Sequence, residues 1–447
     1  MRLLHISTRL ILGGSQENTV LSCEGQARLG HEVHLAFGPI YGPEGSMLER
    51  VQVFRTPSGA GITTHILPHM EREIKPGSDR QCLGELKELI HRLTPDIIHT
   101  HSSKAGILGR VAAWQVMKGL PVATRPGILH TIHGPPFMPI EGGPLGQLKT
   151  RLKNHLYTVA ERYSAKRCHL IVSVADAMTR QFLDRHIGRR DQYRTIRSGM
   201  ETARFLTAAP GESRDDMRAT LGLHPEDFVI GTVARLAQHK GHDDILDAVG
   251  GQLKTHPRWK LLWVGDGWWR DRLLARARQM GLGVVELDAN GGSKEGIEAA
   301  RDRGIKDRSG TTRPTQIILT GLVPQERVPA MMRAMDVLAH PSYREGLPRT
   351  VPQALLCGVC PIAYDADGTG EVCIDMQTGR LVPVADRAKL REAITWAAES
   401  PDLRAALAHR GREMCQELFS AERMVAELEK AYAAALTRAR GTEPQYS

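Results

Sequence analysis

Short apolar runs alternate with stretches of helical periodicity through the first two hundred residues. The apolar runs lie at residues 2–6, 32–37, 96–99, 129–133 and 169–174. Helix-like patterns separate several of them, at residues 83–93, 106–114 and 152–166. Such alternation predicts a parallel sheet covered by helices on both faces, with ligands at the carboxyl ends of the strands.

The same pattern starts again in the second half of the chain. After a pause near residues 196–201 and a polar connector at 208–213, apolar runs follow at residues 228–233, 259–264, 316–320, 337–339 and 359–363. We predict an α/β protein of two doubly wound, Rossmann-like domains that face each other across a cleft. The domains are residues 1–200 and 201–425, followed by a C-terminal helix and tail at 426–447, and residues 288–315 form an insertion.

Length and composition agree with two domains. The chain has 447 residues, of which 41% are apolar, and this exceeds what one hydrophobic core usually supports. No window approaches the roughly 18 apolar residues that a membrane-spanning helix needs, and residues 1–7 lack the pattern of a signal peptide. We therefore expect a cytoplasmic protein.

The positive charge is concentrated in one segment. The chain carries a formal charge of +9, and residues 149–197 hold twelve Lys or Arg against four Asp or Glu, a net +8. Such a cluster attracts phosphate-rich partners, so peripheral contact with an anionic membrane or a lipid diphosphate is one interpretation. A solvated basic helix face is an equally weighted alternative, and nucleic acid is not expected because no recognition module matches.

Two cations follow the first strand of the second domain. Arg235 lies two residues beyond the strand at 228–233, and Lys240 comes five residues later, ahead of a helix. Cations and helix N-termini are groups that bind a diphosphate. An Arg and a Lys on a loop are more often solvated, so the prediction depends on the motif that comes later in the chain.

That motif is His340-Pro-Ser-Tyr-Arg-Glu345-Gly-Leu-Pro348, followed by a helix that ends at Gly358. Gly346 allows the backbone to approach a ligand closely. The N–H groups of Leu347, Arg349 and Thr350 can bind a phosphate oxygen, whereas Pro348 has none.

This stretch resembles the donor site of retaining glycosyltransferases of group 1, family 4. There a Glu-x7-Glu pattern binds sugar hydroxyls with its first carboxylate and the ribose with its second. Glu345 matches the first position, and Gln353 stands at the second, where it loses the charge-assisted part of the hydrogen bond. Since Thr350-Val-Pro-Gln353 also fits a capping box, ribose binding and helix capping both stay open for Gln353.

Other matches keep the order of the family, and they imply its GT-B fold. In the second domain they are Val264-Gly265-Asp-Gly267, Thr320-Gly321 and Asp367-Gly-Thr-Gly370-Glu371. In the first domain Gly13-Gly14-Ser-Gln-Glu17 resembles the Gly-rich loop near the diphosphate. His133 aligns with the histidine that relatives place against the donor sugar, and we prefer it to His101.

The resemblance implies transfer of a sugar from a nucleoside diphosphate sugar to a hydroxyl of a glycan or lipid-linked acceptor, with retention, in cell-surface polysaccharide synthesis. Arg235 and Lys240 would stabilise the leaving diphosphate, while Glu345 and His133 orient the sugar. No Asp-x-Asp pair of the metal-dependent kind is present, because Asp365-Ala-Asp367 fits a loop better. We expect neither metal nor cofactor.

Two alternatives stay open. A sugar-nucleotide epimerase would share the architecture, but it needs acid–base carboxylates in the first domain, where Glu17 is the only candidate. A degenerate transferase acting as a binding partner in polysaccharide assembly would explain why Gln353 replaces the expected glutamate.

Overall fold

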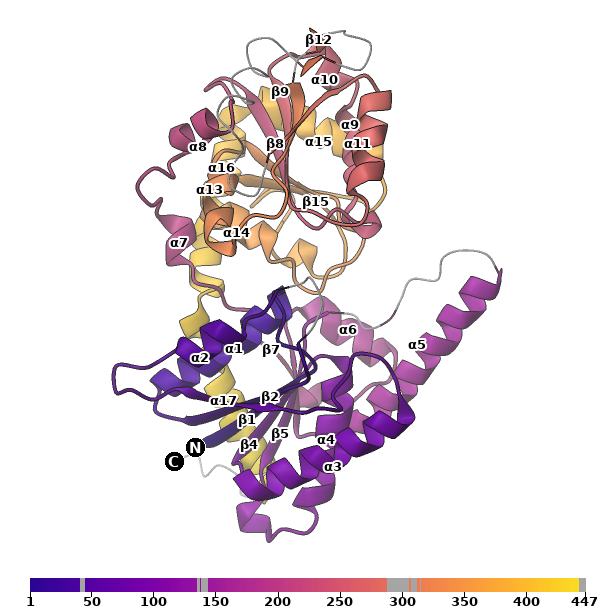
Figure 1. Ribbon diagram of the computed structural model, residues 1–447, viewed down its shortest axis with the longest axis vertical. Helices are drawn as coiled ribbons and strands as arrows, with labels where there is room; N and C mark the ends of the chain where they lie inside the picture. The colour runs from indigo at the N-terminus through magenta and orange to yellow at the C-terminus, as the bar shows by residue number, and fades with distance from the viewer. Residues whose placement is uncertain are drawn as a thin grey trace. The chain divides into compact units, whose positions relative to one another are not determined.

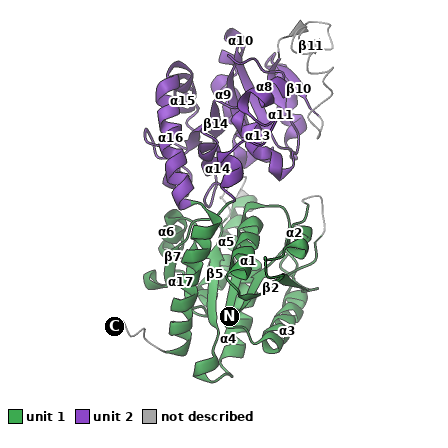
Figure 2. Ribbon diagram, turned by 90° about the vertical axis from the view of Figure 1, so that its left-hand side faces the viewer, with its two compact units in different colours: residues 1–200, 419–447 green, residues 201–418 purple. Residues whose placement is uncertain are grey.

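The computed structural model describes residues 1–40, 45–134, 137, 144–287 and 315–441, together with the backbone of 305–306 and 312–313. The chain divides into two compact units (Figure 2). Unit 1 contains residues 1–200 and 419–447, and unit 2 contains residues 201–418.

Helix α17 (Ala421–Arg440) changes the expected domain assignment. Its residues Met424, Leu428 and Tyr432 belong to the hydrophobic core of unit 1. Assigning residues 419–425 to the second domain and 426–447 to a separate helix and tail was therefore wrong. The reason is physical: the apolar face of α17 is buried against the first sheet, although the helix follows the second in sequence.

Unit 1 is built on a parallel sheet of seven strands in the order β3-β2-β1-β4-β5-β6-β7. The strands are β1 (Arg2–Ser7), β2 (Glu32–Phe37), β3 (Ile62–Ile66), β4 (Ile97–His101), β5 (Gly127–Ile132), β6 (Leu170–Ser173) and β7 (Tyr193–Thr195). The helices, besides α17, are α1 (Gly14–Arg28), α2 (Leu48–Val53), α3 (Pro76–Leu93), α4 (Ser103–Met117), α5 (Pro144–Ala165) and α6 (Asp176–Asp184). They surround the sheet (Figure 1).

Unit 2 repeats the plan, with seven parallel strands in the order β10-β13-β9-β8-β14-β15-β16. The strands are β8 (Phe228–Val233), β9 (Trp259–Val264), β10 (Gly283–Glu286), β13 (Thr315–Leu319), β14 (Val337–His340), β15 (Cys360–Tyr364) and β16 (Arg380–Val382). The helices are α7 (Ala203–Leu206), α8 (Arg214–Thr220), α9 (His242–Val249), α10 (Gln252–Thr255), α11 (Arg270–Gln279), α13 (Val328–Arg333), α14 (Thr350–Leu356), α15 (Arg387–Glu399) and α16 (Pro401–Leu418). Two doubly wound α/β units result.

Every strand expected from the sequence is present, with ends shifted by at most three residues. Within the two seven-stranded sheets the pattern did not reveal four strands, β3, β7, β10 and β16, and these are the outermost strands of the two sheets. An edge strand is short and half-exposed, so it lacks the continuous apolar run that marks an inner strand of a parallel sheet.

The insertion expected at residues 288–315 lies mostly outside the described residues. Within it, β11 (Ile305–Lys306) pairs antiparallel with β12 (Thr312–Arg313). Among the described residues, no helix has both the length and the apolar content to cross a bilayer.

Candidate active site

Three neighbouring strands of unit 2 carry the predicted donor-site residues at their carboxyl ends. Arg235 follows β8, Gly265 follows β9, and Glu345 follows β14, and β8 lies between the other two strands in the sheet. The carboxyl ends of adjacent parallel strands form the usual ligand-binding edge of a doubly wound sheet. The topology therefore brings together residues that are more than one hundred positions apart.

Lys240 and Glu345 are in direct contact. The Nζ atom of Lys240 donates a hydrogen bond of 2.6 Å to Oε1 of Glu345, and Nε2 of His340 lies 3.1 Å from the same oxygen. Burial alone would raise the pKa of Glu345, but the charge of Lys240 and the hydrogen bond from His340 outweigh it and hold that pKa well below its usual range. The site thus contains an ionised carboxylate, with 13% of its side chain exposed, beside a cation.

His340 and Asp367 are site residues that the sequence analysis did not select. Oγ1 of Thr350 lies 3.2 Å from Nδ1 of His340, so Thr350 supports the ring that contacts Glu345. Oδ2 of Asp367 accepts a hydrogen bond of 2.7 Å from the backbone N–H of Glu345. Both residues stand in motifs already recognised, but only the fold shows that both contact Glu345, His340 at its carboxylate and Asp367 at its backbone N–H.

A buried carboxylate, that of Asp244, anchors the loop that carries Glu345. Asp244, on α9, accepts hydrogen bonds from the hydroxyls of Tyr343 at 2.6 Å and Tyr364 at 2.8 Å, and from Nε of Arg387 at 2.8 Å. Its side chain is almost fully buried. Since Tyr343 lies two residues before Glu345, Asp244 fixes the path of the active-site loop.

Two glycines permit close packing of these loops. Gly265 has φ +139°, and a Cβ atom there would lie 2.2 Å from the carbonyl oxygen of Ala234, the residue before Arg235. Gly241, next to Lys240, has φ +72°, and its Cβ would lie 2.1 Å from the carbonyl oxygen of Pro341. Any other residue at either position would move one strand-end loop away from the other.

The start of α14 decides between the two roles of Gln353. Arg349 occupies the N-cap position, Thr350 is the first helical residue, and no side chain caps the helix. The capping-box interpretation is therefore wrong. Gln353 is buried, with 7% of its surface exposed, and ribose binding stays a prediction for it.

The remaining donor-site residues of unit 2 lie on the Glu345 loop and, in the case of Arg235, on the loop after β8. The carbonyl of Gly346 accepts a hydrogen bond of 3.1 Å from the N–H of Gly368, which ties the Glu345 loop to the loop after β15. Leu347 is buried and Arg349 half-buried. Arg235 is exposed, with its guanidinium 5.6 Å from the centre of the Trp268 ring.

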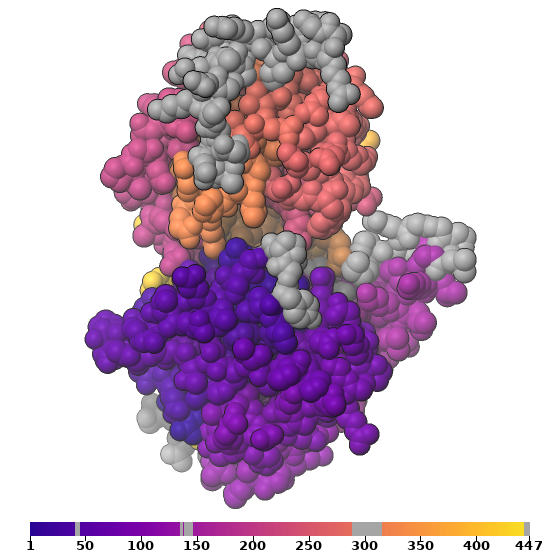
Figure 3. Space-filling view, viewed as in Figure 1, coloured from indigo at the N-terminus to yellow at the C-terminus, as the bar shows by residue number. Residues whose placement is uncertain are grey.

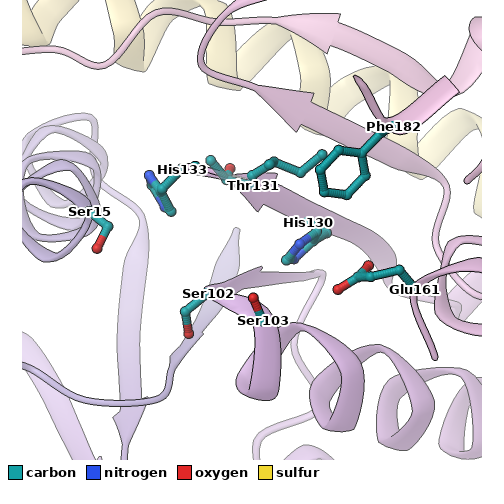
Figure 4. Close-up of a pocket in the computed structure, with 10 residues that line it drawn as sticks. Ser15, Ser102, Ser103, His130, Thr131, His133, Glu161 and Phe182 are labelled. Atoms are coloured by element: carbon teal, nitrogen blue, oxygen red, sulfur yellow. The ribbon is translucent and has the colours of Figure 1, made fainter. Parts of the chain in front are cut away.

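In unit 1 the predicted residues lie near a cavity of about 120 Å³. Its lining includes His133, which directly follows β5, and Ser15, which follows Gly14 at the start of α1. Figure 4 shows the side chains of Ser103, His130 and Glu161 directed toward a common space. Hydroxyl, imidazole and carboxylate groups are suited to binding the hydroxyls of a sugar.

His133 is the outer end of a hydrogen-bonded chain that runs into the core. Its Nε2 atom lies 3.1 Å from Nδ1 of His101, and Nε2 of His101 lies 3.0 Å from Nδ1 of His5. Nε2 of His5 then lies 2.8 Å from Oε1 of Gln26. The Nε2 group of Gln26 donates to the hydroxyl of Tyr432, on α17, at 2.7 Å.

This chain determines which nitrogen of His133 carries the proton. Oε1 of Gln26 can only accept, so His5 must be protonated on Nε2. Burial lowers the pKa of His5 to about 4 and that of His101 well below the usual value, which keeps both rings neutral. Each neutral ring donates with Nε2 and accepts with Nδ1, so His133 carries its proton on Nε2.

His5, His99 and His101 also have the proximity expected of a metal site. One nitrogen from each ring lies within 4.8 Å of the others. However, both nitrogens of His99 are engaged, with Tyr432 and Thr131, as are both nitrogens of His5 and His101. We therefore interpret the cluster as a hydrogen-bonded network, because an ion would have to displace these bonds.

The sequence matches two family models that together span most of the chain. Residues 12–204 match the model described as Glycosyltransferase Family 4, and residues 213–285 and 303–414 match the model described as Glycosyl transferases group 1. The chain belongs to the group 1, family 4 glycosyltransferases. The predicted family is thereby confirmed, and this glycosyltransferase is an enzyme of the transferase class.

Curated relatives of the glycosyltransferase include bacterial transferases of several kinds. EpsD of Bacillus subtilis is 25% identical over 78% of this chain and 79% of its own length. The D-inositol 3-phosphate glycosyltransferase of Saccharomonospora viridis is 28% identical, over 78% and 72%. An Escherichia coli enzyme named UDP-Gal:alpha-D-GlcNAc-diphosphoundecaprenol alpha-1,3-galactosyltransferase is 23% identical, over 73% and 72%.

Solved structures confirm the predicted fold class. HepE of Anabaena, in complex with UDP, aligns with a TM-score of 0.69 at 17% identity, over 97% of this chain and 100% of its own. Sucrose-phosphate synthase of Thermosynechococcus elongatus aligns with a TM-score of 0.72 at 18% identity, over 98% and 100%. The glycosyltransferase therefore has the GT-B fold.

Proposed function

We propose that this glycosyltransferase moves a sugar from a nucleoside diphosphate sugar to a hydroxyl of a glycan or lipid-linked acceptor, with retention of configuration, in cell-surface polysaccharide synthesis. The observation that carries the proposal is the contact between Lys240 and Glu345 at the carboxyl ends of β8 and β14. A cation for phosphate and an ionised carboxylate for sugar hydroxyls lie side by side, as a sugar nucleotide requires.

The roles of the donor-site residues follow from their chemistry. Arg235 and Lys240 bind the diphosphate, Glu345 accepts from sugar hydroxyls, and Gln353 bonds the ribose. The N–H groups of Leu347, Arg349 and Thr350 bind phosphate oxygens, and Gly265, at the end of β9 on the other side of β8, lets its loop pack closely at the same edge of the sheet. In this arrangement Lys240 bridges the carboxylate and the phosphate.

The reaction breaks the bond between the anomeric carbon and the donor phosphate oxygen and forms a bond from that carbon to the acceptor oxygen. The electron pair stays on the diphosphate, so negative charge grows there and the two cations stabilise the transition state more than the ground state. The acceptor proton passes to the departing phosphate oxygen. Glu345 holds the sugar in position.

The acceptor and the donor are proposed from the chemistry of the relatives. The Escherichia coli relative is named for a lipid-linked acceptor, and HepE has been crystallised with UDP-glucose. A UDP sugar is therefore the first donor to try, and the cavity beside His133 is our candidate for the acceptor sugar. We propose that two cations replace a divalent metal, so activity should persist in EDTA.

The experiment that tests the donor site is thermal unfolding with UDP, GDP, ADP and dTDP in turn. A nucleotide at 100 times its dissociation constant stabilises the protein by about 2.7 kcal/mol. We expect a shift with one nucleotide, its loss in Arg235→Ala, and a fall in turnover of about a hundredfold or more in the same variant.

Arg258→Ala is the matched control, because Arg258 is exposed and precedes β9 at the opposite end of the strands. It should retain both the shift and the turnover. A nucleotide shift without transfer to any acceptor tested would favour a degenerate, binding-only protein, which the replacement of glutamate by Gln353 also suggests. Wild-type turnover in Arg235→Ala would overturn the assignment.

A further inference from the structure

Helix α5 carries a stripe of large apolar side chains on its exposed face. The exposed fractions are 65% for Leu148, 60% for Leu152, 57% for Leu156, 48% for Val159 and 48% for Tyr163. At 3.6 residues per turn these five positions fall within about 80° of one another around the helix. A continuous apolar row of this kind is uncommon on a protein surface and marks a site of interaction.

The opposite face of α5 is polar, and this is the face that packs against the unit. Glu161 is buried there and binds Nη2 of the buried Arg110, on α4, at 2.7 Å. Asn154 and Thr158 are half-buried on the same side, and Ser164 is fully buried. A helix on a globular protein normally turns its apolar face inward, so α5 has the reverse orientation.

Cations border the apolar stripe on both sides. At the helical repeat, Lys149 and Lys153 lie along one edge of the stripe, and Arg151 lies along the other. All three side chains are exposed. Long basic side chains beside an apolar row can keep their charges in the headgroup region while the row enters the acyl boundary.

We propose that the exposed face of α5 is a membrane-docking surface that inserts its apolar stripe into an anionic bilayer. The inference deepens the proposed function. It rests on that function in one respect: docking would bring the enzyme to a lipid-linked acceptor. Figure 1 shows the first turns of α5 standing clear of the other described elements of unit 1, and in Figure 3 the helix projects at the right-hand edge.

The charge pattern selects the bilayer over other occupants. A second copy of the chain would place two cation-bordered stripes against each other, with like charges opposed. A nucleic acid would bind the cations but leave the apolar row in water. An anionic lipid surface satisfies both groups at once, because its headgroups attract the cations and its acyl region buries the apolar side chains.

The experiment is co-sedimentation of the full chain with vesicles of phosphatidylcholine alone and of phosphatidylcholine with phosphatidylglycerol. We expect binding to the anionic vesicles only. Leu152→Ser with Leu156→Ser should lower the partition coefficient by about tenfold or more, since two apolar side chains leave the interface. Lys149→Gln with Lys153→Gln should also lower it by about tenfold or more, and this loss should shrink at high salt.

Matched controls exist elsewhere on the surface. Leu403 is 55% exposed and Leu29 is 57% exposed, and both lie outside α5, so Leu403→Ser and Leu29→Ser should leave binding unchanged. Lys389→Gln controls for the loss of a single exposed cation. All variants should keep the nucleotide-dependent thermal shift, which separates failure of docking from failure of the donor site.

Three outcomes would overturn the proposal. Equal binding of wild type and the leucine variant to anionic vesicles would show that the stripe takes no part. Absence of binding to either kind of vesicle would show that a lipid bilayer is not the partner of the stripe. A dimer in sedimentation velocity without lipid, abolished by Leu152→Ser with Leu156→Ser, would assign the stripe to a second copy of the chain.

Discussion

Glu345 keeps its charge in a largely buried position because Lys240 and His340 both contact one of its oxygens. Removing one partner from a buried ion pair leaves the other uncompensated. We expect Lys240→Met to lower the free energy of unfolding of unit 2 by roughly 3 kcal/mol, measured by chemical denaturation. Adding Glu345→Gln should restore part of this loss, and a larger loss in the double variant would contradict the pairing.

His133 provides a second test at the level of single residues. The chain through His101 and His5 to Gln26 predicts a proton on Nε2 of His133, readable from nitrogen chemical shifts of histidine-labelled protein. Gln26→Met removes the acceptor at the inner end, so the single tautomer should become a mixture. His409, which is exposed, serves as an internal reference and should show a mixture in both proteins.

Helix α9 contributes to the site through Asp244, the one aspartate of this helix that is buried. Asp244 binds Tyr343, Tyr364 and Arg387 from a buried position. We expect Asp244→Ala to cost about 3 kcal/mol of stability and to raise the KM for the donor, because the loop that carries Glu345 loses its anchor. Asp247, on the same helix, forms more exposed ion pairs with Arg276 and Arg387.

Asp247→Ala is therefore the matched control for that prediction. Exposed ion pairs contribute about 1 kcal/mol or less, so the KM should stay near the wild-type value. If both substitutions change the KM and the free energy of unfolding equally, Asp244 has no specific role in anchoring the loop, and α9 affects the site only by stabilising unit 2.

Apolar runs alone located the inner strands of both sheets, and they missed every outermost strand. A strand such as β3, with Ile62 buried and Ile66 exposed, has one side open to solvent, and its composition resembles that of a loop. Its hydrogen bonds to β2 make it a strand, and these depend on a partner elsewhere in the chain. Local pattern cannot contain that information.

At the scale of the whole molecule, buried histidines make the stability of unit 1 depend on pH. Burial lowers the pKa of His5 to about 4 and those of His99, His101 and His130 well below the usual value. The folded state therefore binds fewer protons than the unfolded state below about pH 6.5. The stability from these neutral rings is present above that pH and is lost as the pH falls toward 4.

Each such histidine changes the free energy of unfolding by up to about 1.4 kcal/mol per pH unit. Hydrogen exchange should show β4 and β5 losing protection between pH 6.5 and 4.5 more steeply than β8 and β9. In unit 2 burial lowers the pKa of His242 to about 3, so a smaller loss is expected there. Parallel losses in the two units would contradict the assignment of the effect to unit 1.

The amino-acid pattern was enough to predict the α/β architecture, the inner strands and the family. Buried parallel strands have continuous apolar sequences, so they can be recognised locally. The donor-site loop between His340 and Gln353 can also be recognised, because its residues follow a strand end, where ligands bind. Glu345 and Lys240 could be chosen in this way, each from its own loop.

Tertiary structure alone decided the contacts between distant segments. It placed α17 on unit 1, brought His340 and Asp367 to Glu345, joined His133 to Gln26 through two histidines, and turned the apolar face of α5 outward. Periodicity reports that a helix has an apolar face, but only the packing of its neighbours decides whether that face is buried. The physical reason is the same in all four cases. Each depends on contacts between segments that are far apart in the sequence, and the local pattern of apolar and polar residues carries no information about such contacts.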